Sequence, residues 1–220
     1  MASKKHKQHA KQIFQSTLDK FKDIAGNMPD KDSRFDLICK RWQAIIDDEE
    51  LVEKLSFITN FEALVGYQRQ FTKNLSYDRI IAREAEKSAE IDLAIHLIRE
   101  KRGVPITRLS ETTDYKSPDF KQTNGSELYE SKYLETLSKS AIKSKANEAL
   151  TQIKEYAQAN KLLEFGGTVH IFTFDSSMYG TSLQSYLETI KQEMTHTFSF
   201  PFNLNLQTYS SGIYGDACFR

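Results

Sequence analysis

The chain has 220 residues, of which 39% are hydrophobic and 27% are charged, and its formal net charge is +0. A chain of this length buries a sizeable core, and this composition excludes disorder over most of the sequence. No apolar stretch approaches the roughly 20 residues of a membrane span. Cys39 and Cys218 lack metal-ligand spacing, which indicates a reducing compartment. We therefore expect a cytoplasmic protein that does not associate with membranes.

The first part of the sequence predicts helices. Apolar side chains recur with helical spacing in three successive segments and continue toward residue 73. The three segments are residues 6–25, 32–47 and 48–57. A longer helix is expected from about Tyr77 to Arg102, because Gly103 and Pro105 are stop signals. We assign residues 1–75 to a helical region that serves partner binding, dimerisation or substrate binding.

The remaining sequence adds strands. Residues 119–122 and 127–134 read as two strands joined by Asn124-Gly125, a strong hairpin turn. Further elements are a helix near 139–160 ended by Gly166-Gly167, a strand over 168–174, a helix near 181–195 and a strand near 203–209. This order predicts an α/β domain over residues 76–220, with a mixed central sheet flanked by helices.

Two carboxylates and a lysine fall on the predicted hairpin. Asp119 follows Pro118 in the first strand, and Glu130-Ser131-Lys132 lies in the second. Side chains alternate along a strand, so Glu130 and Lys132 share a face, and the turn brings Asp119 back beside them. A divalent cation relieves the repulsion between adjacent carboxylates, whose oxygens suit Mg²⁺ or Mn²⁺. Such a cation polarises a phosphodiester, while Lys132 orients or deprotonates the attacking water or stabilises the developing charge.

Pro118-Asp119, ten intervening residues and Glu130-Ser131-Lys132 resemble the signature of the PD-(D/E)xK nuclease superfamily, which includes restriction endonucleases. The resemblance covers roughly residues 78–175 and implies a restriction-endonuclease-like fold. In that family the Asp and Glu bind the metal, the Lys assists the nucleophilic water, and the intervening residue contributes its backbone carbonyl. The resemblance therefore implies metal ligation by Asp119, Glu130 and the main chain of Ser131, and a catalytic role for Lys132.

The resemblance extends to the two neighbouring helices. Many members carry an acidic residue on the helix before the Pro-Asp strand, and here Glu86 and Glu90 are the favoured metal ligands. Some members carry Gln-x-x-x-Tyr on the following helix, and Gln152 and Tyr156 match it. These two residues lie one turn apart on one helix face. The resemblance gives them a role in positioning a phosphate or the attacking water.

One part of the sequence departs from the family pattern. A first sheet strand is expected between the glutamate-bearing helix and Asp119. The segment from Pro105 to Leu109 is short, and Ser110 to Lys116 is polar and typical of a loop. The choice between Glu86 and Glu90 therefore stays open.

Three lysines lie just past the hairpin, at positions 139, 143 and 145. Beside the proposed metal ligands, Lys139, Lys143 and Lys145 are expected to hold nucleic-acid phosphates. The alternative interpretation is a solvated helix face.

The leading hypothesis is an endonuclease that uses Mg²⁺ or Mn²⁺ and cuts DNA in preference to RNA, in restriction, repair or defence. A second hypothesis is a catalytically inactive module of nuclease fold that binds nucleic acid or a protein. A third is a helical partner-binding protein in which the hairpin is incidental and Glu130 and Lys132 form only cross-strand pairs. Under the leading hypothesis, the N-terminal helices are the expected place for a homodimer interface.

Overall fold

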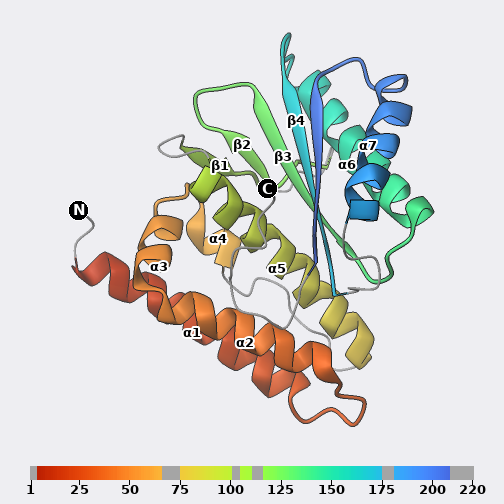
Figure 1. The fold of residues 1–220 in the computed structure, drawn as a ribbon. Helices are drawn as coiled ribbons and strands as arrows, with labels where there is room; N and C mark the ends of the chain where they lie inside the picture. Colours follow the sequence, from red (N-terminus) through yellow and green to blue (C-terminus); the bar gives the residue numbers. More distant parts are fainter. Residues whose placement is uncertain (1–3, 66–74, 101–104, 111–115, 175–180, 209–220) are drawn as a thin grey trace.

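The computed structural model describes residues 4–65, 75–100, 105–110, 116–174 and 181–208. They form an α/β fold in which helices cover both faces of a five-stranded open sheet (Figure 1). The helices are α1 (Lys4–Ala25), α2 (Ser33–Asp47), α3 (Glu49–Ser56), α4 (Phe61–Val65), α5 (Tyr77–Glu100), α6 (Lys139–Ala159) and α7 (Thr181–Thr195). The strands are β1 (Ile106–Arg108), β2 (Phe120–Gln122), β3 (Glu127–Leu134), β4 (Gly166–Thr173) and β5 (Phe202–Thr208). The apolar pattern that continues toward residue 73, with Tyr67 and Phe71, lies partly outside the described residues.

The sheet is mixed and has β3 at its centre, in the order β1-β2-β3-β4-β5. β1, β2 and β3 pair antiparallel, and β3, β4 and β5 pair parallel. The parallel pairs need crossover connections, which α6 and α7 provide. The α/β class with a mixed sheet is thus confirmed. The hypothesis of an incidental hairpin is wrong, because the β2–β3 hairpin forms the middle of the sheet.

β1 is the strand that the sequence pattern left uncertain. It is short, but it pairs along its whole length with β2, from Ile106 opposite Gln122 to Arg108 opposite Phe120. Thr59, before α4, adds one parallel bridge to Thr107 at the outer edge of the sheet. The N-terminal helices therefore contact the same sheet edge that precedes Asp119.

Two apolar cores lie on the two faces of the sheet. One contains the buried side chains of α1 to α5 with Ile106, Phe120 and Tyr129, and the other joins α6 and α7 to Leu128, Val169 and the neighbouring strands. β4 is buried along its full length, as expected for an interior parallel strand covered on both sides. The core of α1 to α5 contains side chains from both sides of residue 75. The division of the chain into residues 1–75 and 76–220 therefore stays a prediction. In the described ranges, no helix is long and apolar enough to cross a membrane.

Gly166-Gly167 has a different role from the one predicted. α6 ends at Ala159, seven residues earlier, and Lys161 beyond it takes a left-handed φ of 55°. The glycine pair instead opens β4, where a Cβ on Gly166 would lie 2.3 Å from Glu127 Oε1. The prediction that these glycines end the helix was wrong: Gly166 packs against Glu127 of β3, and Gly167 packs against Phe200 and Ile153.

Candidate functional site

The candidate site lies where β2 separates from β3. Phe120 is paired with Tyr129, so continuation of the antiparallel ladder would place Pro118 opposite Ser131. Pro118 has no N–H to donate, and the ladder cannot continue there. The Asp119 side chain takes over this position: the Ser131 amide and hydroxyl both donate to Asp119 Oδ2, at 2.7 and 2.5 Å. The carbonyl of Ser131 points to the same gap, because a strand residue directs its N–H and C=O to one side.

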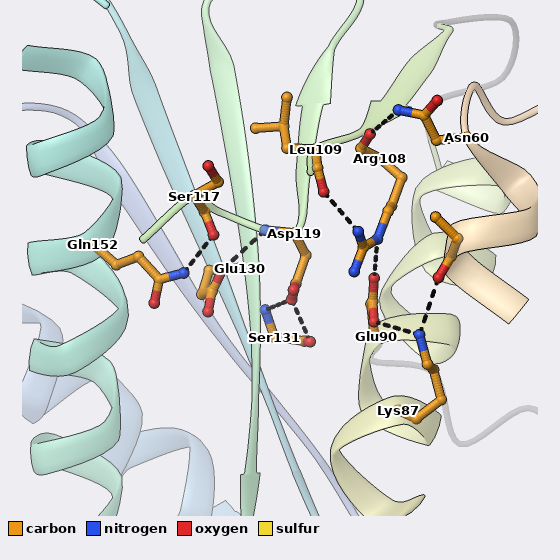
Figure 2. A network of polar contacts seen from close by, with 11 residues as sticks. Asn60, Lys87, Glu90, Arg108, Leu109, Ser117, Asp119, Glu130, Ser131 and Gln152 are labelled. Carbon is orange, nitrogen blue, oxygen red and sulfur yellow. Dashed lines mark hydrogen bonds and ion pairs between the residues drawn. The ribbon is translucent and has the colours of Figure 1, made fainter. Parts of the chain in front are cut away.

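Glu130 lies on the α6 face of β3 and also contacts the segment where β2 separates from β3 (Figure 2). The Asp119 amide donates to Glu130 Oε2 at 2.9 Å, so each of the two acidic residues is tied to the other strand by its carboxylate (Figure 2). Figure 2 places Glu130 on the side of α6, and Asp119 with Ser131 on the side of α5. The predicted pair of acids is therefore brought together around one strand edge.

Lys132 is held on the α6 face by three oxygen atoms. Its Nζ lies 2.7 Å from Glu130 Oε1, 3.1 Å from Gln152 Oε1 and 3.3 Å from Glu148 Oε1. Gln152 Nε2 also donates to the Ser117 carbonyl at 2.6 Å. Gln152 thus joins the lysine to the Pro-Asp segment, and its role in positioning a phosphate or the attacking water stays a prediction. Tyr156 lies one turn further along α6, in the core between this helix and the sheet.

The positive charge near Asp119 and Glu130 is too small to offset the burial and mutual repulsion of their carboxylates. Burial and then the nearby charge of Glu90 raise the pKa of Asp119 to about 6, although Ser131 and Lys132 act in the opposite direction. Burial and the charge of Asp119 raise the pKa of Glu130 well above its ordinary value, against the effect of Lys132. Burial alone would lower the pKa of Lys132, but the charges of Glu130, Glu148 and Asp119 outweigh it and the pKa is raised. Lys132 is therefore a cation at neutral pH.

The structure separates the two upstream glutamates. Glu90 is buried on α5, and its charge acts on Asp119, whereas Glu86 is exposed. Glu90 Oε1 accepts a hydrogen bond from Arg108 Nε at 2.8 Å, and Lys87 Nζ lies 3.2 Å from Glu90 Oε2. Glu90 is thus the acid of α5 that lies beside the site, and two cations hold it there (Figure 2).

The donor set suits one hard divalent cation. Asp119, Glu130 and the Ser131 carbonyl supply oxygen atoms from one strand edge, and the raised pKa values show that added positive charge would be stabilising there. No group of three or more His, Cys, Asp or Glu side chains among the described residues is arranged to hold a metal. Mg²⁺ often binds through one or two carboxylates and completes its shell with water and substrate phosphate. The residues present fit such a cation.

The three predicted phosphate-binding lysines are paired with acids on the protein. Lys139 and Lys143 both contact Glu193 of α7, at 3.2 and 2.8 Å. Lys145 Nζ lies 3.0 Å from Glu148 Oε2, and Glu148 in turn contacts Lys132. Lys145 is therefore connected to the candidate site through Glu148, whereas Lys139 and Lys143 lie against α7.

Two residues of the site were not predicted. Glu148 precedes Gln152 by four positions, so helical spacing alone places both on one face and was a usable signal. Arg108 carried no such signal, because its contact with Glu90 depends on how β1 packs beside α5.

Comparisons with protein-family models, with curated proteins and with solved structures found no match. The coarse class, an α/β protein with a mixed open sheet, is what the structure defines.

Proposed function

We propose that this protein is a Mg²⁺- or Mn²⁺-dependent endonuclease with a restriction-endonuclease-like fold, which hydrolyses phosphodiester bonds and favours DNA over RNA. One observation carries the proposal. Asp119 and Glu130 are interlocked across the point where β2 leaves β3, with Lys132 at 2.7 Å from Glu130. Buried carboxylates with raised pKa values, beside a positioned lysine, are typical of functional sites.

Each residue has a role in this proposal. Asp119, Glu130 and the Ser131 carbonyl would hold the cation, which when bound polarises the phosphodiester and lowers the pKa of water. The raised pKa of Lys132 favours one of its possible roles, since a protonated amine stabilises negative charge on the phosphoryl oxygens but cannot take a proton. Gln152 positions Lys132 through its amide oxygen.

The substrate is proposed from the family resemblance and the basic residues. Lys145, next to Glu148 at the site, and the more distant Lys139 and Lys143 would contact backbone phosphates. Such contacts carry no base preference, so they support nucleic acid as the class of substrate. A homodimer formed through the N-terminal helices would place two such sites for cutting two strands.

A cleavage assay tests the proposal directly. The purified chain is incubated with supercoiled plasmid, single-stranded DNA and RNA, with Mg²⁺, with Mn²⁺ or with EDTA. We expect nicking or linearisation of DNA that needs the metal and is lost in Asp119→Asn. Glu155→Gln, which alters an exposed carboxylate of α6, is the matched control. Equal activity of the parent and Asp119→Asn would contradict the assignment of the site.

A specific observation favours the inactive binding module as a second candidate. Both oxygens of Glu130 already have partners within the protein, Lys132 Nζ and the Asp119 amide. A metal-free site could therefore persist as a structural network in a module that binds nucleic acid or a protein. Calorimetry separates the two candidates: Mn²⁺ uptake that depends on Asp119 supports the nuclease, and no uptake together with DNA binding supports the module.

A further inference from the structure

Glu90 is a buried carboxylate whose two oxygens each face a cation. Arg108 Nε is 2.8 Å from Oε1, and Lys87 Nζ is 3.2 Å from Oε2. Only 9% of the Glu90 side chain is exposed. Its position beside Asp119 makes it the natural candidate for a third metal ligand, but its own charge is already balanced by the protein.

Both cations are themselves anchored. Lys87 Nζ also donates to the carbonyl of Ala63 in α4, at 3.3 Å, and Arg108 Nη1 donates to the Leu109 carbonyl at 2.9 Å. The main chain of Arg108 is fixed by two hydrogen bonds. Its N–H donates to the Thr59 carbonyl at 3.1 Å, and its carbonyl accepts from the Asn60 side-chain amide at 2.8 Å. Figure 2 shows the contacts of Asn60, Lys87, Glu90 and Arg108, which join the segment around α4 to α5 and β1 beside the site. Movement of Glu90 toward a metal would leave two largely buried cations without their carboxylate, which is unfavourable.

The acids on the other side of the gap differ in their partners. Asp119 Oδ2 is bound by the amide and hydroxyl of Ser131, which are neutral donors. Glu130 shares its one cation, Lys132, with Glu148. A divalent cation would therefore gain most from Asp119 and Glu130 and least from Glu90.

We infer that Arg108 is a positioning residue that, together with Lys87, keeps Glu90 out of the coordination sphere of the metal. The site then takes a single divalent cation, on Asp119 and Glu130, instead of two. This inference rests on the proposed function, because it concerns the metal of the same site. It also gives the N-terminal region a part in the site, since Thr59, Asn60 and Ala63 hold the residues that restrain Glu90.

Manganese binding by the full chain tests the inference without any measurement of activity. The stoichiometry and affinity for Mn²⁺ are measured by calorimetry, and electron paramagnetic resonance reports whether bound ions form a coupled pair. We expect the parent to bind one ion per chain. Asp119→Asn should lose at least about tenfold in Mn²⁺ affinity, because mutation of residues that only orient a metal ligand already costs about 10–100-fold. The charge-neutral double variant Glu90→Met/Arg108→Met should stay within about threefold of the parent, because ligand number and charge at the ion are unchanged.

The single variant Arg108→Met gives a readout that a merely structural residue would not. Release of Glu90 from Arg108 should raise Mn²⁺ affinity about threefold or more, or add a second ion, because another carboxylate becomes available. Arg108→Lys, which keeps the charge, should restore parent values, and Glu155→Gln is the control for loss of a carboxylate elsewhere. Thermal melting by circular dichroism checks that each variant is folded.

Three results would overturn the inference. Equal loss of Mn²⁺ affinity in the double variant and in Asp119→Asn would make Glu90 a ligand. Unchanged or weaker binding by folded Arg108→Met would remove the positioning role of Arg108. Either result leaves the proposed nuclease intact, whereas a parent protein that takes up no Mn²⁺ overturns both the proposed function and the inference.

Discussion

Asp119 just before β2, Glu130 within β3 and Glu90 on α5 are neighbouring carboxylates with little solvent access, but the protein balances their charges differently. Asp119 is bound by the neutral donors of Ser131, and Glu130 by the Asp119 amide and a lysine that also contacts Glu148. Glu90 instead faces Arg108 and Lys87, one at each oxygen. Among the described residues, Asp119 and Glu130 together contact one cation, Lys132, whereas Glu90 alone contacts two.

This difference distinguishes a candidate site from its scaffold. Burial raises the pKa of Asp119 and of Glu130, so ionising them costs more in the folded protein than in water, and a bound cation would offset that cost. The contacts of Glu90 are of the kind that fix one arrangement of α4, α5 and β1. Residue type and burial alone would rank all three acids as metal ligands, and only the identity of their partners separates them.

The largest expected effect is on catalysis, through Lys132. Under the proposed function, Lys132→Met should slow Mn²⁺-dependent cleavage by about 10²–10³-fold, because removal of one donor that stabilises developing negative charge costs on that scale. Single-turnover cleavage of plasmid measures this rate. Lys154→Met, which alters an exposed lysine of α6, is the matched control and should stay near the parent rate. A parent-like rate in Lys132→Met would remove the lysine from the mechanism.

The next effect is on stability, through the group around Glu90. Arg108→Met leaves Glu90 buried with one cation instead of two, and should lower the free energy of unfolding by about 3 kcal/mol. Urea denaturation at neutral pH without metal measures this difference. The double variant Glu90→Met/Arg108→Met should recover part of the loss, because Glu90 and Arg108 are removed together and only Lys87 loses its carboxylate partner. Equal instability of the single and double variants would show that packing, not charge, dominates this region.

The carboxylate site should make the metal-free protein less stable as pH rises. The pKa of Asp119 is about 6 in the folded state and near its ordinary 3.8 in the unfolded state. The folded state therefore binds the Asp119 proton more tightly than the unfolded state does. The stability that this proton gives to the folded state is fully present below about pH 4 and is lost as pH rises through about 6. The loss is on the order of 2–3 kcal/mol. We expect Asp119→Asn to lack it, and thus to unfold at higher urea than the parent at pH 7.

A metal control sharpens the same measurement. Added Mn²⁺ should raise the unfolding midpoint of the parent at pH 7, because the ion binds only the folded site. The midpoint of Asp119→Asn should change much less. A parent whose unfolding midpoint is the same at pH 4 and pH 7, after correction with the Asp119→Asn curve, would contradict the buried environment assigned to Asp119.

A smaller effect is expected at Asn60, which joins the N-terminal helices to β1. Asn60 has a left-handed φ of 64°, its carbonyl accepts from the amides of Ala63 and Leu64, and its amide group donates to the Arg108 carbonyl. Asn60→Ala should cost about 1–2 kcal/mol, because it strains the backbone and removes the hydrogen bond. Asn60→Gly relieves the strain and should cost less. Thermal melting compares the two, and a smaller loss in the alanine variant would contradict this account.

The smallest effect concerns Lys143 of α6, whose ion-pair partner is Glu193 of α7. Its contact with Glu193 is at the surface, so Lys143→Ala should leave the thermal midpoint unchanged. If Lys143 contacts a phosphate, the variant should weaken DNA binding evenly across sequences and reduce the slope of log affinity against log salt by about 1. Fluorescence anisotropy over a salt series measures this slope. An unchanged slope would assign Lys143 to the solvated helix face.

Much of the fold follows from local pattern. The helical spacing of apolar residues predicts α1, α2, α3 and α5 to within a few residues, and Asn124-Gly125 predicts the β2–β3 hairpin. β1 was uncertain because three residues carry too little periodicity to indicate a strand, and its pairing with β2 supplies what the sequence lacks. Gly166-Gly167 was misread because a glycine that avoids a neighbouring side chain and a glycine that ends a helix have the same sequence signal.

The sequence by itself determined the pairing of Asp119 with Glu130 and the shared face of Glu130 and Lys132, because a tight hairpin and the alternation of side chains are short-range constraints. It also determined that Gln152 lies on one helix face with Glu148. Only the tertiary structure decided between Glu86 and Glu90, and only it brought Arg108 to Glu90, whereas Lys87 lies three residues before Glu90 on α5 and faces it by helical spacing. The physical reason is that burial and charge compensation depend on which distant segments meet, here α4, α5 and β1, and no local pattern records that meeting.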